Sequence, residues 1–379
     1  MKHKTHLKLT DLKRVNQRKE FLEKELAINL KDIASVLIDD EKDVHCENLI
    51  GAISLPLGVA GPINIQGKYI NGDYFLPLAT SEGALVASVN RGCKVVNQSG
   101  GVLTNVEQVG TSRAPVFETS GIRQGLIIKK WLHENFHEIK KVTKSTSSHL
   151  ELLDIKVQII GVYVFVRFLF DSEDAMGMNM VTIATEKIIE FINKQTDTVN
   201  LSIAGNYEVD KKPAWLNMIS GRGKRIWAES IIKNTQIIDT LKTTPQKIFD
   251  VWLAKCMIGS AISGSLGFNS HFANIVAAFY AATGQDLAHT VEGSLGVTTT
   301  KILSNQDLYF SVYLPDIMIG TIGGGTRLKT QAEAINIIGV KKSYELAEVL
   351  AAAVLAGELS LLASLAEGSL AKAHSKLGR

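Results

Sequence analysis

This chain has few cysteines and almost no net charge. Cys46, Cys93 and Cys256 lie far apart and form no C-x-x-C pair, so the simplest interpretation is a reduced, intracellular protein. The N-terminal stretch "MKHKTHLKLTDLKRVNQRKEF" has no apolar core segment and does not resemble a signal peptide. No G-x-G-x-x-G follows an expected strand, so the Rossmann dinucleotide fingerprint is absent.

The composition excludes further classes of protein. A net charge of +3 on 379 residues is too small for a nucleic-acid coat or a membrane-surface protein. Hydrophobic residues make up 45% and charged residues 21%, as in ordinary soluble globular proteins. The most apolar tract, "VLAAAVLAGELSLLASLAEGSLAKAH", contains Glu358 and Glu367, which favours a buried helix over a membrane span. We therefore expect a cytoplasmic protein without nucleic-acid or membrane partners.

Hydrophobic periodicity predicts both helices and strands. Residues up to about 45 show the spacing of amphipathic helices. "LATSEGALVASVNRGCKVVNQSGG" predicts a helix that starts near Ser81 and ends at Gly100. "DIKVQIIGVYVFVRFLF" is rich in β-branched and aromatic residues and has Gly161 in its middle, which predicts a hairpin, and helical spacing returns after it. Strand, helix, hairpin and helix within about 115–203 indicate a small α+β unit.

Two glycine-containing segments are candidate ligand sites. "DAMGMNM" begins at Asp174, just before a predicted helix whose first N–H groups could bind an anion, although a tight turn explains it equally well. "GTIGGGT", from Gly320 to Thr326, could admit a phosphate or allow tight backbone packing.

Several polar residues are ambiguous when taken singly. Lys211 and Lys212 are adjacent and cannot both be buried without partners, so a solvated turn is the ordinary interpretation. Asp286 follows Gly-Gln as a helix cap often does, and His374 lies near the chain end, where a surface role is usual.

One apparent metal motif carries little weight. "HENFH" contains H-E-x-x-H, from His133 through Glu134 to His137, and on a helix this spacing binds zinc for hydrolysis. No clear third ligand follows, and the surrounding residues indicate a charged, solvated helix. We therefore expect no metal.

Longer motifs together carry a family resemblance. The segments "ENLIGAISLPLGVAGP", "TSEGALVASVNRGCK", "DAMGMNM", "GNYEVDKKPAWLNMISGRGK", "IGSAISGSLGFNSHFANIVAAFYAATGQD", "IGTIGGGT" and "GELSLLASLAEGSLAKAH" occur in this order from Glu47 to His374. The chain resembles 3-hydroxy-3-methylglutaryl-CoA (HMG-CoA) reductases. "DKKPAWLN" is similar to the class I form, here in its soluble microbial version without a membrane anchor.

The resemblance implies an α+β fold in three parts. A helical N-terminal region, 1–45, would precede a large α/β domain built around a long central helix, formed by 46–114 and 204–379. A small ferredoxin-like domain that binds NADP(H), 115–203, would be inserted into it. The family also implies a homodimer or higher homo-oligomer with the site at the subunit interface, to which "ENLIG" contributes.

The implied reaction converts HMG-CoA to mevalonate and CoA, using two NADPH in two hydride transfers for isoprenoid biosynthesis. By resemblance, Lys211 faces the developing oxyanion, and Glu82 donates a proton to it. Asp286 would couple these two groups, and His374 would protonate the CoA thiolate. The resemblance also implies two groups of binding residues. The cofactor-binding residues are Asp174, Met176, Met178, Asn179, Gly323, Gly324 and Thr326, and the substrate-binding residues are Ser88, Arg113, Asp210, Lys212, Lys255, His271 and Asn274.

The chain departs from the family pattern at three places. Ala204 replaces a common serine, and "GSLGFNSH" is one residue shorter than usual, which affects the assignment of His271. Class I enzymes often place an arginine for the 2′-phosphate of NADPH where this chain has Ser148, with Lys144 and His149 nearby.

NADH thus stays open beside NADPH. Two rival hypotheses for the function are a non-catalytic relative that binds CoA thioesters, and a zinc hydrolase. The four catalytic residue types are all retained, which argues against the non-catalytic relative.

Overall fold

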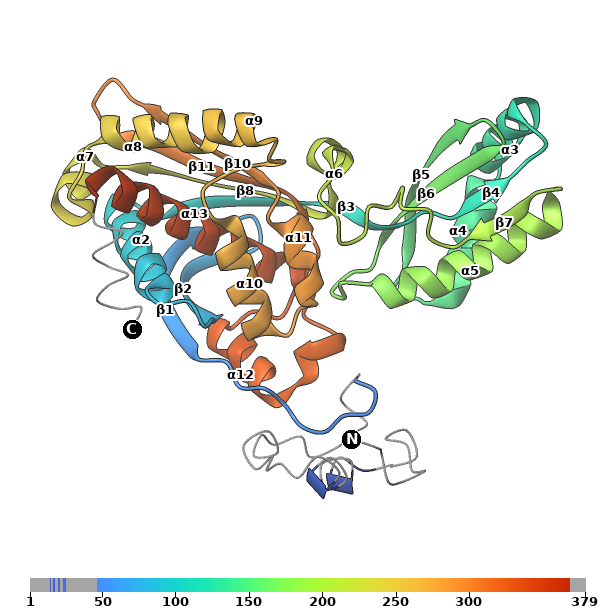
Figure 1. Cartoon of the computed structure of the whole chain (residues 1–379), viewed down its shortest axis with the longest axis horizontal. Coiled ribbons are helices and arrows are strands. Elements are labelled where there is room, and N and C mark those ends of the chain that lie inside the picture. The colour runs from blue at the N-terminus through green and yellow to red at the C-terminus, as the bar shows by residue number, and fades with distance from the viewer. Residues whose placement is uncertain (1–13, 15, 18–19, 21–22, 25–45, 369–379) are drawn as a thin grey trace.

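The computed structural model describes residues 46–368 together with Arg14, Asn16, Gln17, Glu20, Glu23 and Lys24 (Figure 1). The amphipathic helices expected up to residue 45 therefore lie almost wholly outside the described residues, as does His374.

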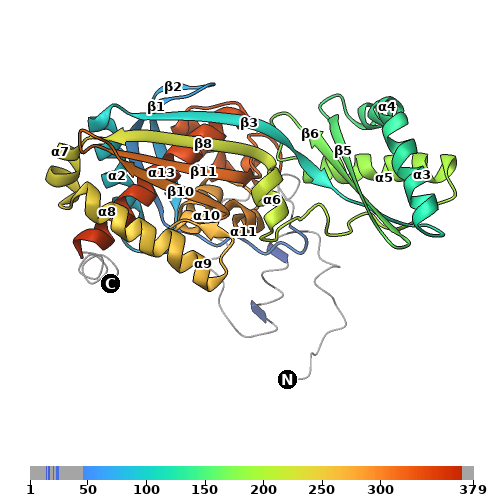
Figure 2. The same ribbon diagram turned by 90° about the horizontal axis from the view of Figure 1, so that it is seen from above.

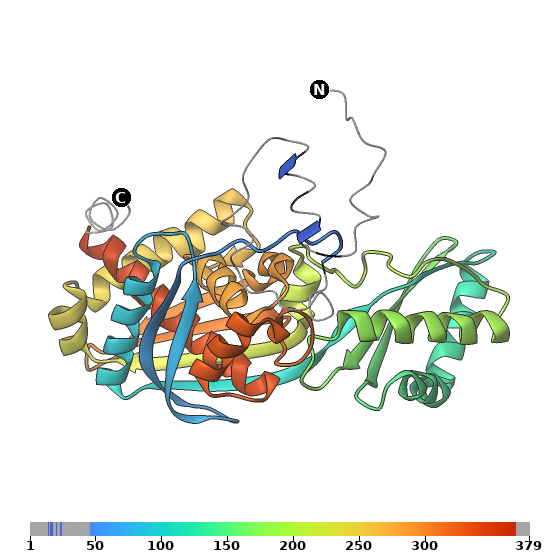
Figure 3. The same cartoon turned by 90° about the horizontal axis from the view of Figure 1, so that it is seen from below.

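The larger part of the molecule is a mixed sheet covered by helices. Its strands follow the order β2-β1-β3-β8-β11-β10-β9 and pair antiparallel, except that β1 with β3 and β9 with β10 are parallel. Figure 3 shows β1 and β2 (blue) beside the helix α2 (cyan). The strands are β1 (Leu57–Gln66), β2 (Asn71–Ala79), β3 (Val102–Arg113), β8 (Arg222–Ile232), β9 (Gly267–Phe268), β10 (Gly296–Ile302) and β11 (Leu308–Ile317).

The helix α13, Ser343–Glu367, forms the centre of this part (Figure 1). It is rich in alanine and leucine and nearly all of its side chains are buried, including Glu348 and Glu358. Its length and composition would let it cross a membrane, but 78% of its most apolar window is buried inside the protein. The described part of the apolar tract, up to Gly368, thus belongs to a core helix, as the sequence indicated.

Further helices pack around the sheet and α13. They are α2 (Leu85–Ser99), α6 (Trp215–Ser220), α7 (Asn234–Gln236), η4 (Ile237–Leu241), α8 (Pro245–Trp252), η5 (Leu253–Gly259), α9 (Ser260–Ser263), α10 (Phe272–Thr283), η6 (Leu287–His289), α11 (Thr290–Gly293), η7 (Gly324–Arg327) and α12 (Lys329–Ile338).

The smaller part has its own sheet and its own buried cluster (Figure 2). Its strands β4 (Val116–Glu118), β5 (Glu151–Ile160), β6 (Tyr163–Asp171) and β7 (Val199–Ser202) follow the antiparallel order β7-β4-β6-β5. The far end of β3 also pairs with β6, so one long strand runs through both parts. Its helices are α3 (Ile122–Glu134), α4 (Phe136–Thr146) and α5 (Met178–Gln195).

The structure confirms some of the predictions made from local sequence patterns and contradicts others. The hairpin is confirmed, with Gly161 at a φ of 61° in its turn. The helix start near Ser81 is wrong. The Thr80 hydroxyl oxygen accepts the Glu82 N–H, and Ala84 is left-handed, so α2 begins only at Leu85.

The predicted end of α2 is confirmed, because Gly100 caps it at a φ of 117°. The continuous helix that H-E-x-x-H would need is absent from this region. Asn135 separates α3 from α4, so His133 and His137 lie on different helices, both exposed.

Candidate functional site

Lys211 lies on a loop whose backbone is held in an uncommon conformation. Asn206, Val209 and Lys211 all have positive φ, and for the β-branched Val209 this is an outlier. Such strain persists only where the surroundings hold it in place. The Lys211 N–H donates to Glu292 Oε1 at 3.1 Å, which fixes the loop from its buried side.

The side chain of Lys211 meets Asp286. The two residues are far apart in sequence, but Lys211 Nζ lies 2.7 Å from Asp286 Oδ2, and both side chains keep more than a third of their surface exposed. Asp286 Oδ1 also accepts the Ala288 N–H and caps η6. Burial acts to raise the pKa of Asp286, but the hydrogen bonds from Lys211 and Ala288 outweigh it and lower the pKa below its ordinary value. Asp286 is thus both a helix cap and the partner of a half-exposed ammonium.

Glu82 lies with Asn274 at the other end of α10. Asn274 Nδ2 donates to Glu82 Oε2 at 2.8 Å near the start of α10, whereas Asp286 follows its C-terminal end. A helix of 12 residues is about 18 Å long. Within one chain the structure therefore brings Lys211 to Asp286 and Glu82 to Asn274, as two separate pairs.

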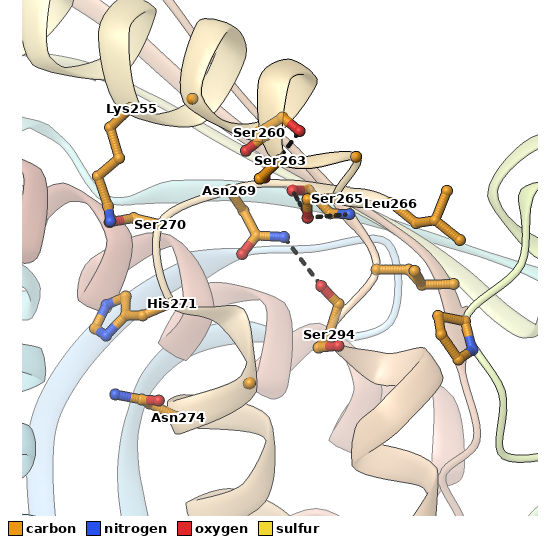
Figure 4. Close-up of a pocket in the computed structure, with 16 residues that line it drawn as sticks. Lys255, Ser260, Ser263, Ser265, Leu266, Asn269, Ser270, His271, Asn274 and Ser294 are labelled. Atoms are coloured by element: carbon orange, nitrogen blue, oxygen red, sulfur yellow. Dashed lines mark hydrogen bonds between the residues drawn. The ribbon is translucent and has the colours of Figure 1, made fainter.

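A cavity of about 1020 Å³ opens beside the start of α10 (Figure 4). Lys255, His271 and Asn274 lie along one side, and the Lys255 side chain extends from η5 toward Ser270 and His271. Pro213, from the loop of Lys211, also lines the cavity. One ammonium, one imidazole, two amides and several serine hydroxyls in a large open cavity suit an anionic ligand that also carries hydroxyl groups.

The buried carboxylate of Glu358 holds in place the backbone that leads into α10. It accepts the backbone N–H groups of Ser270 and His271 and the hydroxyl of Thr298. His271 Nε2 is buried and has no hydrogen-bond partner among the described residues. The shorter "GSLGFNSH" spacing therefore still delivers an imidazole to the cavity.

The other substrate-side candidates lie apart from this cavity. Ser88 Oγ donates to Ser360 Oγ on α13 at 3.0 Å, so it is held between α2 and α13. Arg113 donates to Thr182 Oγ1 and lies 3.9 Å from Glu208 Oε1. Lys212 is exposed on the loop beside Lys211.

A second cavity, of about 590 Å³, lies where the two parts of the molecule meet. Its lining includes Asp174 at the "DAMGMNM" turn and His149 and Ile322 on neighbouring segments. The Asp174 carboxylate accepts from Lys342 Nζ at 2.7 Å and from the Ser343 N–H at 3.0 Å. Burial opposes these contacts, but their net effect lowers the pKa of Asp174. Asp174 therefore fastens the turn to the start of α13.

The turn after Asp174 leads into the start of α5. Gly177 precedes the helix at a φ of 93° and no side chain caps it, so its first N–H groups are available to an anion. Met176 lies before this cap and Asn179 is exposed in the first helical turn. Met178 is buried, and its sulfur lies 3.0 Å from Arg222 Nη2, which makes it a packing residue in this structure.

The two interpretations of "GTIGGGT" apply to different glycines. A Cβ on Gly320 would lie 2.4 Å from Met176 N, so that position serves tight backbone packing. Gly323 and Gly324 have positive φ and open space around them, which suits close approach of a ligand. Thr326 Oγ1 donates to Gly323 O and closes this turn.

Sequence reasoning missed a buried ionic cluster beneath Lys211 and Asp286. Arg222, His289 and Glu292 are fully buried. Glu292 Oε1 accepts from Arg222 Nη1 at 2.8 Å and contacts His289 Nδ1 at 2.6 Å, and Arg222 Nη2 reaches Asp210 Oδ1 at 2.9 Å. The spacing Asp286-x-x-His289-x-x-Glu292, which repeats along one face of a helical turn, was the available signal.

The comparisons with known proteins agree on one family. A family model described as "Hydroxymethylglutaryl-coenzyme A reductase" matches residues 14–379. The 3-hydroxy-3-methylglutaryl-coenzyme A reductase of Methanocaldococcus jannaschii is 48% identical over 96% of this chain and 92% of its own length. That of Methanothermobacter thermautotrophicus is 46% identical over 96% and 93%. The class II 3-hydroxy-3-methylglutaryl-CoA reductase of Streptococcus pneumoniae, solved bound to NADPH, shares the fold with a TM-score of 0.68 at 19% identity, covering 93% of this chain and 97% of that one.

Proposed function

The chain belongs to the hydroxymethylglutaryl-coenzyme A reductase family, and from that premise we propose how its own residues carry out the reaction. The protein reduces the thioester HMG-CoA to mevalonate and CoA in the mevalonate pathway. The change consumes two hydrides and two protons. The C–S bond breaks, and the sulfur leaves as a thiolate that must be protonated. We assign the chain to class I, because "DKKPAWLN" is similar to the class I form of that motif. We place it in the cytoplasm, because Cys46, Cys93 and Cys256 are all free, as is usual in a reducing compartment.

The observation that carries the assignment of roles is the 2.7 Å contact between Lys211 Nζ and Asp286 Oδ2. Each hydride transfer leaves negative charge on the carbonyl oxygen, and Lys211 supplies the cation that stabilises it. Asp286 stays ionised, and its contact with the Lys211 ammonium orients that group toward the carbonyl oxygen. Glu82 gives the oxygen its proton, and Asn274 Nδ2 orients that carboxyl. His374, which lies outside the described residues, protonates the CoA thiolate.

The substrate's acyl end is assigned to the larger cavity. Lys255 and His271 line it and complement a terminal carboxylate and a hydroxyl, respectively. Arg113, Lys212 and Ser88 would join them only with rearrangement or from a partner subunit, because they lie outside the cavity lining. Asp210 acts through Arg222 and holds the loop of Lys211.

A reduced nicotinamide dinucleotide supplies the hydride, and the second cavity fits it. The uncapped start of α5 suits the pyrophosphate, and the open space at Gly323 and Gly324 admits a close-lying ring or phosphate. We assign residues 115–203 to this task as a ferredoxin-like cofactor domain, on the support of the strand order β7-β4-β6-β5.

NADPH is the proposed form of the cofactor, and one assay tests both the function and this choice. The absorbance of reduced nicotinamide in the near ultraviolet is expected to fall only when HMG-CoA is present, with a larger kcat/KM for NADPH than for NADH. One observation supports the alternative cofactor, NADH. The Glu173 carboxylate lies on the wall of the second cavity, where it can accept a hydrogen bond from a ribose hydroxyl that carries no phosphate. No HMG-CoA-dependent oxidation with either cofactor would falsify the enzymatic function.

We further propose that the site is completed by a second copy of the chain. One thioester carbonyl cannot touch both ends of α10, yet Glu82 and Lys211 must act on the same oxygen. A twofold dimer can place the start of α10 in one subunit beside the end of α10 in its partner, because its interface brings residue i of one subunit to residue j of the other and j to i.

Mixing two inactive variants tests this shared site. Lys211→Met and Glu82→Gln each remove one group, and each homodimer is expected to be nearly inactive. If the groups come from different subunits, half of the randomly mixed dimers carry one intact site. Activity then recovers to about a quarter of wild type. Sites contained within single subunits would give no recovery, and subunit exchange is checked with differently tagged chains.

A further inference from the structure

The cluster beneath the site holds an imidazole between two carboxylates. His289 has no exposed surface, with Nδ1 2.6 Å from Glu292 Oε1 and Nε2 3.8 Å from Asp286 Oδ2. Asp286 Oδ2 is the same oxygen that meets Lys211 Nζ. The His289 ring thus lies next to Asp286, which is the partner of the proposed catalytic ammonium of Lys211. Nothing in the reaction outlined above uses it.

The hydrogen bonds around Glu292 define which ring nitrogen carries a proton. Glu292 Oε1 accepts from Arg222 Nη1 and from the Lys211 N–H, so this oxygen acts as an acceptor. His289 Nδ1 must then be the donor in the 2.6 Å contact. Nε2 has no hydrogen-bond partner among the described residues and faces the Asp286 carboxylate. An unprotonated Nε2 would direct its lone pair at a negatively charged oxygen, which is unfavourable. A protonated Nε2 would direct its N–H at that oxygen, which is favourable.

We propose that Glu292 and His289 are positioning residues, with His289 held as an imidazolium whose Nε2–H faces Asp286. In this arrangement Glu292 fixes the backbone of Lys211 and the ring of His289 at once. The imidazolium keeps Asp286 ionised, and ionised Asp286 holds the Lys211 ammonium in line with the oxyanion. No proton leaves His289 in the cycle. The inference rests on the catalytic role proposed for Lys211.

The remaining charged groups around the ring leave this assignment intact. Asp210 Oδ1 lies 3.9 Å from His289 Nδ1 and adds a third negative charge. The single positive charge of Arg222 is shared between Glu292, through Nη1, and Asp210, through Nη2. On the other packed elements, burial raises the pKa values of Tyr280 and Asp316 well above their ordinary values, which favours their uncharged forms.

A metal ion is the competing interpretation of the same residues. Asp210, His289 and Glu292 could each offer one ligand atom, and these atoms lie within 4.8 Å of one another. The Arg222 guanidinium already contacts both carboxylates, and a metal would have to displace it from a fully buried position. The cluster is therefore assigned to a protonated imidazole.

The variant His289→Gln tests the proposal through its pH profile. The amide can still donate to Glu292 but cannot carry a positive charge. Loss of that charge raises the pKa of Asp286, so the acidic limb of the kcat/KM profile is expected to move up by about one pH unit. We also expect kcat to fall about tenfold while KM for HMG-CoA changes less than about twofold. His133→Gln, the same change at an exposed position on α3, serves as the control.

Two results would overturn the proposal. One is a His289→Gln profile that matches wild type in shape. The other comes from neutron diffraction of the wild-type protein near neutral pH, which needs no variant to fold. Deuterons on both ring nitrogens of His289 are expected, and a bare Nε2 contradicts the imidazolium. Activity of the wild-type protein toward HMG-CoA is scored separately, so failure of the reductase function is distinguished from failure of this inference.

Discussion

Replacing Lys211 with methionine is expected to lower kcat for HMG-CoA reduction by at least about a hundredfold. Methionine keeps most of the side-chain volume but removes the charge that faces the developing oxyanion. The 2.7 Å contact with Asp286 also disappears, which leaves a carboxylate near the reacting oxygen where a cation stood. Charge on the oxygen exists only during the reaction, so KM should change far less than kcat.

Lys301→Met is the matched control for this prediction. Lys301 is exposed on β10, and its replacement leaves the site untouched. Stopped-flow absorbance of the first hydride transfer separates the chemical step from product release. If the Lys211 variant retains the wild-type rate of that step, the proposed oxyanion contact is wrong. A similar loss in the Lys301 variant would instead indicate a general effect of removing a positive charge.

The elements that the sequence predicted well are those whose signals are local. The hairpin has β-branched residues on both strands and Gly161 between them, so its register follows from neighbours in the chain. The helix α13 is apolar on all sides, which only burial explains. Local signals failed where a turn competed with a helix, because Thr80 and Ala84 form a turn before α2. They failed again at Asn135, whose side-chain amide donates to Trp131 O where α3 ends.

The candidate site depended on the family resemblance rather than on local pattern. Lys211 and Asp286 lie 75 residues apart in sequence, and no periodicity relates them. The buried cluster was missed for the same physical reason, since Arg222 on β8 meets Glu292 on α11 only after the sheet has formed. The sequence does not distinguish a charged residue that will be buried from one that will lie on the surface. Only the structure shows that Arg222 and Glu292 have no exposed surface.

Replacing Arg222 with methionine is expected to be the most destabilising single change in this cluster. Arg222 Nη1 contacts Glu292 and Nη2 contacts Asp210, and Nε donates to Ser112 Oγ at 2.9 Å. Without the guanidinium, Glu292 and Asp210 share the proposed His289 imidazolium as their remaining cation, and Glu292 has no exposed surface to hydrate its charge. Removing one partner of such a buried pair costs about 3–5 kcal/mol in the free energy of unfolding. Urea unfolding followed by tryptophan fluorescence measures this loss.

Two further variants show whether the cost comes from the excess negative charge left at Glu292 and Asp210. Arg225→Met changes the same residue type three positions along β8. Arg225 lies 4.0 Å from a half-exposed Glu107, so about 1 kcal/mol or less is expected. The double variant Arg222→Met/Glu292→Gln removes both charges and should recover much of the stability. Recovery of stability without activity is expected, because the Lys211 N–H then loses its ionised acceptor and the loop loses its anchor. If the Arg222 and Arg225 variants were equally stable, Glu292 would be solvated despite its burial, and it could not hold His289 and Lys211 in place.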